Sequence, residues 1–463
     1  MTIKVFEKEK AKLLQQPEIL EAWLAYQSRF PHLSKYFRAS DQYPHQMAVV
    51  NGKKTGSDIN LYKLFLEQCV NLLKTGGQCG IVIPSGIYTD LGATGLRQLL
   101  FNETQITSLF CFENRKAIFE GVHRSFKFVV LSFEKGKKTT EFPAMFMRHD
   151  VNELADFPQT GTLILNTDLI RRLSPDSQSV MEFKNAMDVH IAEKMLQFPL
   201  LGEKLEGVWN LALTSEFHMT NDSHLFHTEP AKDRLPLYEG KMIHQFEHQF
   251  AEPRYWVDEE EGRKALLGKK AEDSGQLLDY QRYRLGFRDV ASSTNERTMI
   301  ATVLPPKIFC PHTMSLEMVA QSSLSPKERI FLVALFNSYL VDYLIRQRIT
   351  AHLSFFFVYN LPIPRLTKTD AAFTPIVTRA AQLICTTPEF DDLAKAVGLN
   401  SHKNGVTDPK KRAQLRAELD GMVAHLYGLT QKEFEHILAT FPLVKPEVKE
   451  SALKAYLKFA KKQ

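Results

Sequence analysis

The sequence lacks the features of membrane, secreted and disulfide-rich proteins. No stretch reaches the roughly 20 apolar residues that a membrane helix needs. The first residues, MTIKVFEKEKAKLL, are charged and contain no apolar core of the kind found in a secretory signal. There are only five cysteines and no CxxC pair, so thiols in a reducing cytoplasm are expected rather than disulfides or zinc ligands.

A strong excess of one charge is also absent. Across 463 residues the formal net charge is +5, which permits binding to DNA but does not predict it. The hydrophobic content of 44% is that of a globular protein, and the length suggests two or three domains. Composition therefore leaves the function open, and only local patterns can indicate it.

Residues 58–90 predict a helix that is followed by a strand. Asp58 can cap the helix, and Gly76 and Gly77 suit the left-handed positions at its end. Residues 79–83 form a short apolar run before the loop 84–86, which predicts a buried strand opening into a loop. In open α/β sheets such a loop borders the ligand crevice. The expected apolar stripe of the helix consists of Leu61, Leu64, Phe65, Cys69, Leu72 and Leu73.

The pattern continues with a helix near 91–100, a strand at 106–112 and a strand at 126–133, so that two successive strands end the domain. The segments LYKLF, GGQCGIVIPSG and IFEGVHRSFKF occur in this order. Together they resemble the tail of an adenine-specific DNA methyltransferase domain in the large single-chain methylases of type IIG restriction-modification systems and related phage-defence methylases. The resemblance implies an α/β fold, the C-terminal half of a class I S-adenosylmethionine-dependent methyltransferase domain.

Later segments resemble the target-recognition region of the same family. They are YEGKMIHQF at 238–246, YRLGFRDVASSTNERTMIATVLPP at 283–306 and FNSYLVDYLIRQRITAHLSFFFVYNLPIPR at 336–365, while residues 412–444 are similar to its terminal helical part. We therefore expect four parts. These are a partial methyltransferase domain at 1–150, a connector at 151–205, an α+β DNA target-recognition domain at 206–366 and a helical C-terminal region at 367–463.

Two family motifs are missing from the printed sequence. Members of the family bind S-adenosylmethionine with a glycine-rich turn followed by an acidic residue, and no such turn is found here. They hold the target adenine with an Asn-Pro-Pro-aromatic motif, whereas the only Pro-Pro pair is Pro305-Pro306, preceded by Leu304. Residues 1–57 resemble the segment that follows this motif. No catalytic residue is therefore assigned in this chain. We expect an N-terminal methyltransferase polypeptide to carry cofactor binding and base chemistry. In a remnant, both would be lost.

The loop that runs through Gly121 resembles the family loop beside a flipped adenine, and an apolar or aromatic pocket there would hold an unstacked base. In the other interpretation Phe119 and Phe126 only anchor the hairpin. The sequence favours neither interpretation over the other. The cofactor-proximal candidates are Tyr62, which also suits simple helix packing, and Pro84. The base-pocket candidates are Phe119, Ser125, Phe126 and Lys127.

Arginines interleaved with aromatics between 280 and 297 are the main candidates for DNA contact, because guanidinium groups bind phosphates and guanine edges. From composition alone, internal Arg–carboxylate pairs or a solvated face are the more common outcome. Ser325, Pro326 and Glu328 predict a capped helix reaching Tyr343, and the aromatic run 355–357 is expected in the core. The DNA-contact candidates are Lys241, Arg284, Arg288, Arg297, Arg348 and His352.

The segment HQFEH at 244–248 matches the HxxEH pattern of inverted zinc proteases, but its flanks look extended, so metal chemistry is not expected. Two functions stay open. The first is a site-specific N6-adenine DNA methyltransferase, in restriction-modification or phage defence, whose catalysis needs an upstream chain. The second is a non-catalytic DNA-binding specificity subunit or remnant. Both imply double-stranded DNA as partner, and the first implies S-adenosylmethionine as cofactor.

Overall fold

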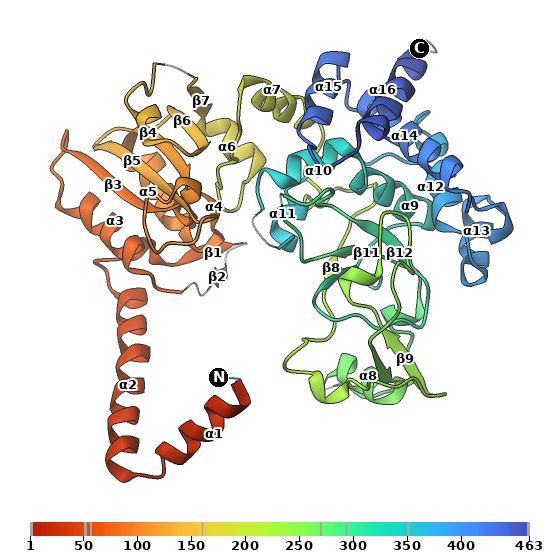
Figure 1. Ribbon diagram of the computed structural model, residues 1–463, viewed down its shortest axis with the longest axis horizontal. Coiled ribbons are helices and arrows are strands. Elements are labelled where there is room, and N and C mark those ends of the chain that lie inside the picture. Colours follow the sequence, from red (N-terminus) through yellow and green to blue (C-terminus); the bar gives the residue numbers. More distant parts are fainter. Residues whose placement is uncertain are drawn as a thin grey trace. The chain divides into compact units, whose positions relative to one another are not determined.

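The computed structural model of the chain describes residues 3–50, 53–55, 58–159, 161–268, 271–292, 294–349 and 352–460. It divides into two compact units, Met1–Asn185 and Ala186–Gln463 (Figure 1). Each unit has its own core and is described by itself. The boundary lies later than the expected end of the first domain at residue 150, because residues 151–185 add a strand and a helix to the first unit.

The first unit begins with a pair of helices outside its sheet (Figure 1). Pro17 occupies the first turn of the second helix, where its missing N–H costs nothing. None of the described residues of that helix is buried. The opening elements are α1 (Ile3–Leu13), α2 (Pro17–Ala39), η1 (Pro44–Gln46), β1 (Ala48–Val50) and β2 (Lys53–Thr55).

A five-stranded sheet in the order β3-β5-β4-β6-β7 forms the body of the first unit. Strands β3, β4 and β6 run one way, and β5 and β7 run the other way. The elements are α3 (Leu61–Leu72), β3 (Gln78–Pro84), α4 (Gly86–Thr89), η2 (Leu91–Ala93), α5 (Thr94–Glu103), β4 (Thr104–Glu113), η3 (Asn114–Lys116), β5 (Lys127–Lys135), β6 (Glu141–Arg148), η4 (Val151–Leu154), β7 (Leu163–Asn166) and α6 (Thr167–Leu173). The α/β class expected for this part is confirmed, and β6 and β7 extend the sheet beyond the two strands expected to end it.

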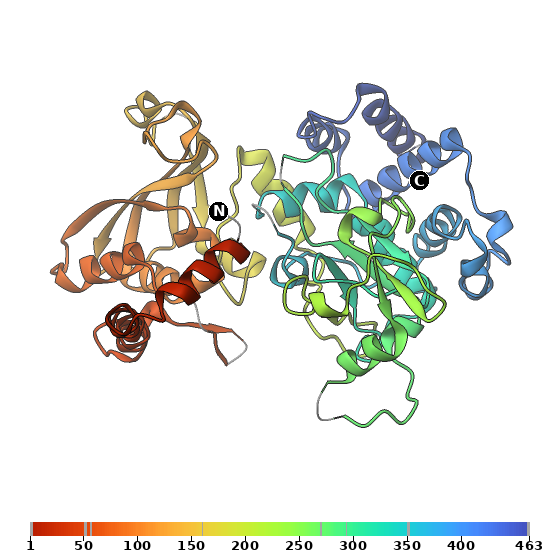
Figure 2. The ribbon, with the colours of Figure 1, turned by 60° about the horizontal axis from the view of Figure 1, so that its bottom comes forward.

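The start of α3 differs from the expectation. Asn60, not Asp58, is the N-cap, and its side chain accepts a hydrogen bond from the Tyr62 N–H. Gly76 has the expected left-handed conformation, with φ of 79°. Strand β3 was expected to be buried, but among its residues only Ile83 is. The reason is its place, because β3 is an outer strand that pairs with β5 alone among the described residues (Figure 2).

The expected stripe of α3 is divided between two faces. Leu64 packs inside together with Leu66 and Val70. Leu61, Phe65 and Leu72 point outward and are 68%, 60% and 77% exposed. An amphipathic helix on a sheet normally buries one apolar face, so α3 carries a second apolar face that no described residue covers.

The second unit combines small antiparallel sheets with helices. Its main sheet has the order β12-β11-β13-β8, and β9 pairs with β10. The elements are α7 (Ala186–Met195), β8 (Leu213–Thr214), η5 (Ser223–Leu225), β9 (Arg234–Leu237), η6 (Gly240–Met242), β10 (Tyr255–Asp258), α8 (Glu259–Leu267), η7 (Asp279–Gln281), β11 (Arg284–Arg288), β12 (Ala301–Leu304), β13 (Met314–Glu317), α9 (Pro326–Phe336), α10 (Tyr339–Arg346) and α11 (Phe355–Tyr359).

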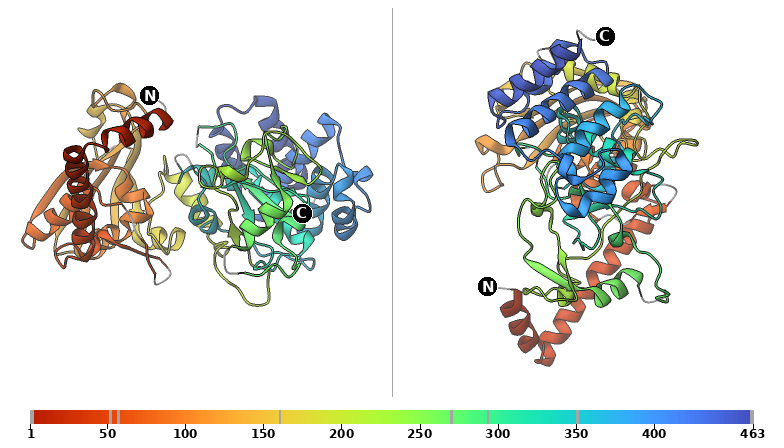
Figure 3. Two further views of the ribbon diagram at one scale, coloured as in Figure 1. Left: turned by 90° about the horizontal axis from the view of Figure 1, so that it is seen from below. Right: turned by 90° about the vertical axis from the view of Figure 1, so that its right-hand side faces the viewer.

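Helices complete the second unit, and α14 and α16 lie side by side (Figure 3). Asp408 caps α14, while Thr430 and Glu433 form a capping box on α15, as the sequence predicted. These helices lie in one compact unit with the sheet. They are α12 (Phe373–Ile384), η8 (Pro388–Phe390), α13 (Asp391–Val397), η9 (His402–Asn404), α14 (Pro409–Leu426), α15 (Gln431–Ala439) and α16 (Pro446–Ala460).

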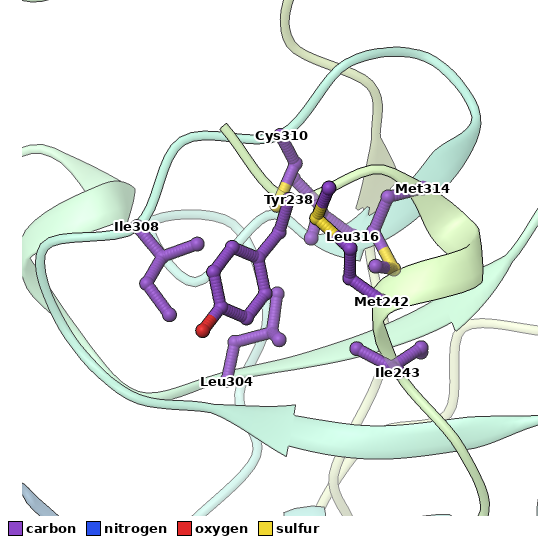
Figure 4. Close-up of a cluster of buried hydrophobic side chains, with 8 residues drawn as sticks. All are labelled: Tyr238, Met242, Ile243, Leu304, Ile308, Cys310, Met314 and Leu316. Atoms are coloured by element: carbon purple, nitrogen blue, oxygen red, sulfur yellow. The ribbon is translucent and has the colours of Figure 1, made fainter. Parts of the chain in front are cut away.

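The segment 238–246 contributes to the core of the second unit. Tyr238, Met242 and Ile243 pack with residues from β12, β13 and the loop between them (Figure 4). The helix that starts at Ser325 has the expected capping box with Glu328 but ends at Phe336. It ends there because the Asn337 side chain bonds to both the N–H and the carbonyl of Ala301 on β12.

Candidate functional site

One end of the sheet in the first unit gathers polar groups. Because β3, β4 and β6 are parallel in direction, their carboxyl ends at Pro84, Glu113 and Arg148 share an edge. Strand β5 starts at this edge with Lys127, since it runs the opposite way. Loops at the carboxyl edge of a sheet are the usual place for a ligand crevice in α/β proteins.

Lys127, a base-pocket candidate, is fixed by an ion pair. Its Nζ lies 2.6 Å from Glu182 Oε2, and both side chains are largely buried. The Tyr88 hydroxyl donates to Glu182 Oε1 at 2.9 Å and contacts Cys111 Sγ at 2.8 Å. Burial raises the pKa of Tyr88 well above its usual value. The Lys127 ammonium group is therefore held in place by the Glu182 carboxylate, which the neutral Tyr88 hydroxyl in turn orients.

The loop between η3 and β5 is ordered by Asn114. Its side-chain amide donates to the Phe119 and Val122 carbonyls, and its oxygen accepts from the Phe119 N–H. The Phe119 ring packs edge-on against Phe128 with centroids 4.9 Å apart, yet about half of it stays exposed, as does Phe126. The loop thus both anchors the hairpin and presents aromatic surface, so the two interpretations weighed from the sequence are compatible.

Ser125 lies at the exposed tip of the same loop. Its hydroxyl and the His123 Nδ1 are 2.8 Å apart. The side chain is solvent-exposed, so it does not pack in the core.

Tyr62 and the loop after β3 meet at the same edge. A Cβ at Gly86 would collide with the Asp90 carboxylate and lie 2.9 Å from the Tyr62 hydroxyl oxygen, so this approach requires a glycine. Burial, followed by the charge of Asp90, raises the pKa of Tyr62 above its usual range. Behind them the buried Arg97 donates to the Ser177 and Ile87 carbonyls.

This arrangement could contact a nucleoside cofactor from one side but does not surround it. Tyr62, Asp90 and Gly86 already fill the space at the end of β3 with the chain's own atoms. Pro84 ends the strand beside them.

Four residues at this edge were not identified from the sequence, namely Asp90, Arg97, Asn114 and Glu182. Glu182 lies 55 residues beyond its partner Lys127, and no local periodicity links positions so far apart. Asn114 had a weak signal, because asparagine is common where a side chain replaces backbone hydrogen bonds in a loop.

In the second unit, three of the six DNA-contact candidates are structural. Arg284 is fully buried, pairs with Glu216 and donates to the Ile308 carbonyl at 2.5 Å. Arg297 pairs with Asp342 at 2.7 Å and lies over the Tyr339 ring. Their expected role as surface contacts is corrected, because both guanidinium groups are enclosed with a carboxylate.

Arg348 is also buried, and its Nη1 donates to the Asn360 carbonyl at 3.3 Å. Burial lowers its pKa to about 10. Its role as a direct DNA contact is corrected for the same reason, since a phosphate could reach it only after the local structure opened. The aromatic run 355–357 after it is only half-buried.

Lys241, Arg288 and His352 remain accessible. The Lys241 Nζ lies 3.4 Å from Glu239 on the surface. His352 is exposed and 2.7 Å from Asp289. Arg288 is half-buried, with two of its nitrogens bonded to the Ile243 carbonyl.

The HxxEH segment is not helical. His244 and Glu247 form an isolated antiparallel bridge, and His248 Nε2 lies 2.9 Å from Glu389. Two ligands of such a motif would need to share one helix face. In the described ranges no group of three metal-binding side chains comes together.

Part of this fold, with the ends of β3 and β4, lies in a methyltransferase-type region, a class that in general uses S-adenosylmethionine. Residues 36–119 match the family model "Eco57I restriction-modification methylase". The resemblance to restriction-modification methylases is thereby confirmed for this part of the chain. No curated protein matches the sequence significantly.

Among solved structures, the type IIL restriction-modification enzyme MmeI in complex with DNA is similar at 12% identity and a TM-score of 0.47, over 87% of this chain and 53% of that chain. The type IIG restriction endonuclease BpuSI has 12% identity and a TM-score of 0.31, over 81% and 50%. The chain thus spans about half the length of these two proteins. At such scores no residue role is transferred from them. In the described part of the chain, no helix combines the length and apolar character needed to cross a bilayer.

Proposed function

We propose that this chain is the target-recognising part of a site-specific N6-adenine DNA methyltransferase in a restriction-modification or phage-defence system. The observation that carries the proposal is the family match over residues 36–119. S-adenosylmethionine would supply the methyl group, and an amino nitrogen can accept it without a covalent enzyme intermediate. The contribution of the protein is then positioning and exclusion of water.

We further propose that catalysis needs a cofactor-binding polypeptide that is not among these 463 residues, whether joined to this chain or separate. The sequence contains neither the glycine-rich turn nor the Asn-Pro-Pro-aromatic motif. Helix α3, whose outward face carries Leu61, Phe65 and Leu72, packs against the open strand β3, on which Val82 is 52% exposed. An open strand edge pairs readily with another strand, and exposed apolar patches mark protein interfaces.

In the resulting site Tyr62 and Pro84 would border the cofactor, and the loop with Phe119 and Phe126 would contact the extruded adenine. Lys127 would hold its position through Glu182. The half-exposed aromatic rings support this role, since an unstacked base is held by apolar and aromatic side chains. Lys241, Arg288 and His352 are the contacts with double-stranded DNA that remain after Arg284, Arg297 and Arg348 are set aside.

The test is methyl transfer from labelled S-adenosylmethionine to duplex DNA, followed by mass spectrometry of the digested nucleosides. Residues 1–463 alone should be inactive, and co-expression with the polypeptide encoded next to them should give N6-methyladenine. Methylation by the isolated chain would contradict the need for a partner. Methylation of cytosine would contradict the adenine assignment.

The alternative function, a non-catalytic DNA-binding specificity subunit or remnant, predicts the same DNA binding without methylation in either preparation. Its affinity for duplex DNA should fall with salt according to the number of phosphates neutralised. Absence of duplex binding by the chain, alone and with its partner, would exclude both functions.

A further inference from the structure

A cavity of about 740 Å³ lies inside the second unit, between the recognition sheet and the C-terminal helices. Its walls come from the segment 244–246, from β11 and the residues after it, and from α9, α10, α14 and α16. Its wall includes apolar residues, among them Phe246, Ile300 and Val444. The cavity also holds two arginines, Arg288 and Arg416, that form no close ion pair among the described residues.

The first of these is Arg416 on α14. It is half-buried, lines the cavity and forms no hydrogen bond or ion pair within the part of the chain that the structure describes. The second is Arg288 at the end of β11, whose guanidinium group, among the described residues, donates to the neutral Ile243 carbonyl. Partial burial of a cation without a close ion pair costs free energy, which an anionic ligand would offset.

The other charges near the cavity balance one another. Arg297 and Arg346 lie against Asp342 at 2.7 and 3.6 Å. Asp420 accepts the Tyr339 N–H at 2.9 Å, and the positive charges of Arg297 and Arg416 act on its carboxylate. Glu296 and Glu447 also belong to the lining, but both are exposed to solvent, which screens them.

The pKa of His244 responds to the charges that surround the cavity. Its pKa is lowered from 6.5 to about 4, first by burial and then by the positive charges of three arginines around it. A partly desolvated pocket with two guanidinium groups that form no close ion pair, beside apolar side chains, has the chemistry to hold a phosphate ester.

We propose that this cavity is a phosphate-binding site, in which Arg416 and Arg288 hold the phosphate group and the apolar wall contacts the organic part of the ligand. Two sources share this chemistry, the backbone of the DNA duplex and a free nucleotide. The DNA source rests on the proposed function, whereas the free ligand does not.

The test compares Arg416→Gln with Lys411→Gln, because both positions lie on α14 and lose one positive charge. Lys411 is exposed and lies outside the cavity lining. With a duplex of about 30 base pairs, Arg416→Gln should reduce the slope of log K against log salt by about 0.9 and the affinity about eightfold at 0.1 M salt. With inorganic pyrophosphate, the melting temperature of the wild type should rise above that in sodium chloride of equal ionic strength, and Arg416→Gln should remove the rise. Lys411→Gln should leave both readouts near wild type.

A loss confined to the duplex assigns the site to the DNA backbone, and a loss with pyrophosphate as well assigns it to free phosphate esters. If wild type binds pyrophosphate through Arg416 but binds no duplex, the cavity proposal holds and the proposed function fails. If the duplex binds equally well to all three proteins and pyrophosphate stabilises none of them, the cavity proposal is wrong while the proposed function stands.

Discussion

At Arg284 a guanidinium group is enclosed beside Glu216 with no exposed surface. Removing one member of a buried pair leaves an uncompensated charge, whereas replacing both with apolar or neutral groups of similar volume is tolerated. Both substitutions change the stability of the folded state. Measuring that stability therefore distinguishes a structural arginine from an arginine that only contacts DNA.

We expect Arg284→Ala to lower the free energy of unfolding by about 3–5 kcal/mol, measured by urea denaturation of the whole chain. The double variant Arg284→Met with Glu216→Gln should recover most of this loss. Lys241→Ala, at an exposed site, is the control and should change stability by less than about 0.5 kcal/mol. An Arg284→Ala protein of wild-type stability would contradict the internal role.

His244 should make stability depend on pH. Its pKa in the folded chain is about 4, below the usual 6.5, so the unfolded chain binds the proton first as pH falls. The contribution of this histidine to the free energy of unfolding is therefore fully present above pH 6.5 and is lost as the pH falls from 6.5 to 4. Between pH 7 and pH 5, His244→Asn should lose about 1 kcal/mol less than wild type, after allowance for its partial exposure.

Asp420, in the same cavity, acts with the opposite sign. Burial raises its pKa to about 6, so the folded chain takes up this proton before the unfolded chain does, which adds stability as pH falls below 6. The comparison of His244→Asn with wild type cancels that contribution. Equal pH dependence of the two proteins in urea midpoints at pH 5 and pH 7 would contradict the account of His244.

At the scale of elements, caps and periodicity were the most readable signals. The capping box of Ser325 with Glu328, the cap of Asp408 and the left-handed Gly76 follow from side-chain chemistry within a few residues. The solvent exposure of a strand could not be predicted from nearby residues in this way. The apolar run of β3 has the composition of a central strand, but whether a strand is covered depends on neighbours that are distant in sequence.

The site was partly readable for the same reason. Tyr62, Pro84 and Lys127 lie at one edge of the sheet, as the order of strands allowed one to expect. Their partners Asp90 and Glu182 depend on tertiary packing, which no spacing reveals. Composition could not separate buried arginines such as Arg348 from exposed ones, because both occur among aromatic residues.

The two outer strands of the first sheet provide a matched pair for testing the docking of the cofactor-binding polypeptide. Val82 on β3 and Ile164 on β7 are 52% and 58% exposed, but β3 is the strand that packs against α3. We expect Val82→Lys to reduce co-purification with the co-expressed polypeptide at least tenfold, and Ile164→Lys to leave it unchanged. Circular dichroism should show both variants folded, and equal capture of the two would exclude β3 as the docking edge.

At the scale of the whole molecule, the two units differ in how completely they cover their apolar surface. Helices α9 and α10 are buried along nearly their whole length, whereas α3 exposes Leu61, Phe65 and Leu72. Each unit has its own core, so each can be examined separately.

We expect residues 186–463 to melt cooperatively and to bind little of the dye 8-anilinonaphthalene-1-sulfonate, because their core is closed. Residues 1–185 should fold but bind the dye strongly, and Phe65→Lys should reduce the signal while Val151→Lys, at another exposed site, should not. Dye binding confined to 186–463 would contradict this assignment of the open surface.

The outward face of α3 also bears on how the chain fares in a cell. Proteases and chaperones act on polypeptides that display large apolar side chains, and this chain displays such side chains on α3 and β3 as well as along α2. Under the proposed function, the amount of this chain that survives would be set by the amount of the cofactor-binding polypeptide that covers α3 and β3. Such dependence would match the supply of the two polypeptides without any dedicated regulator, since the surplus of one would be degraded.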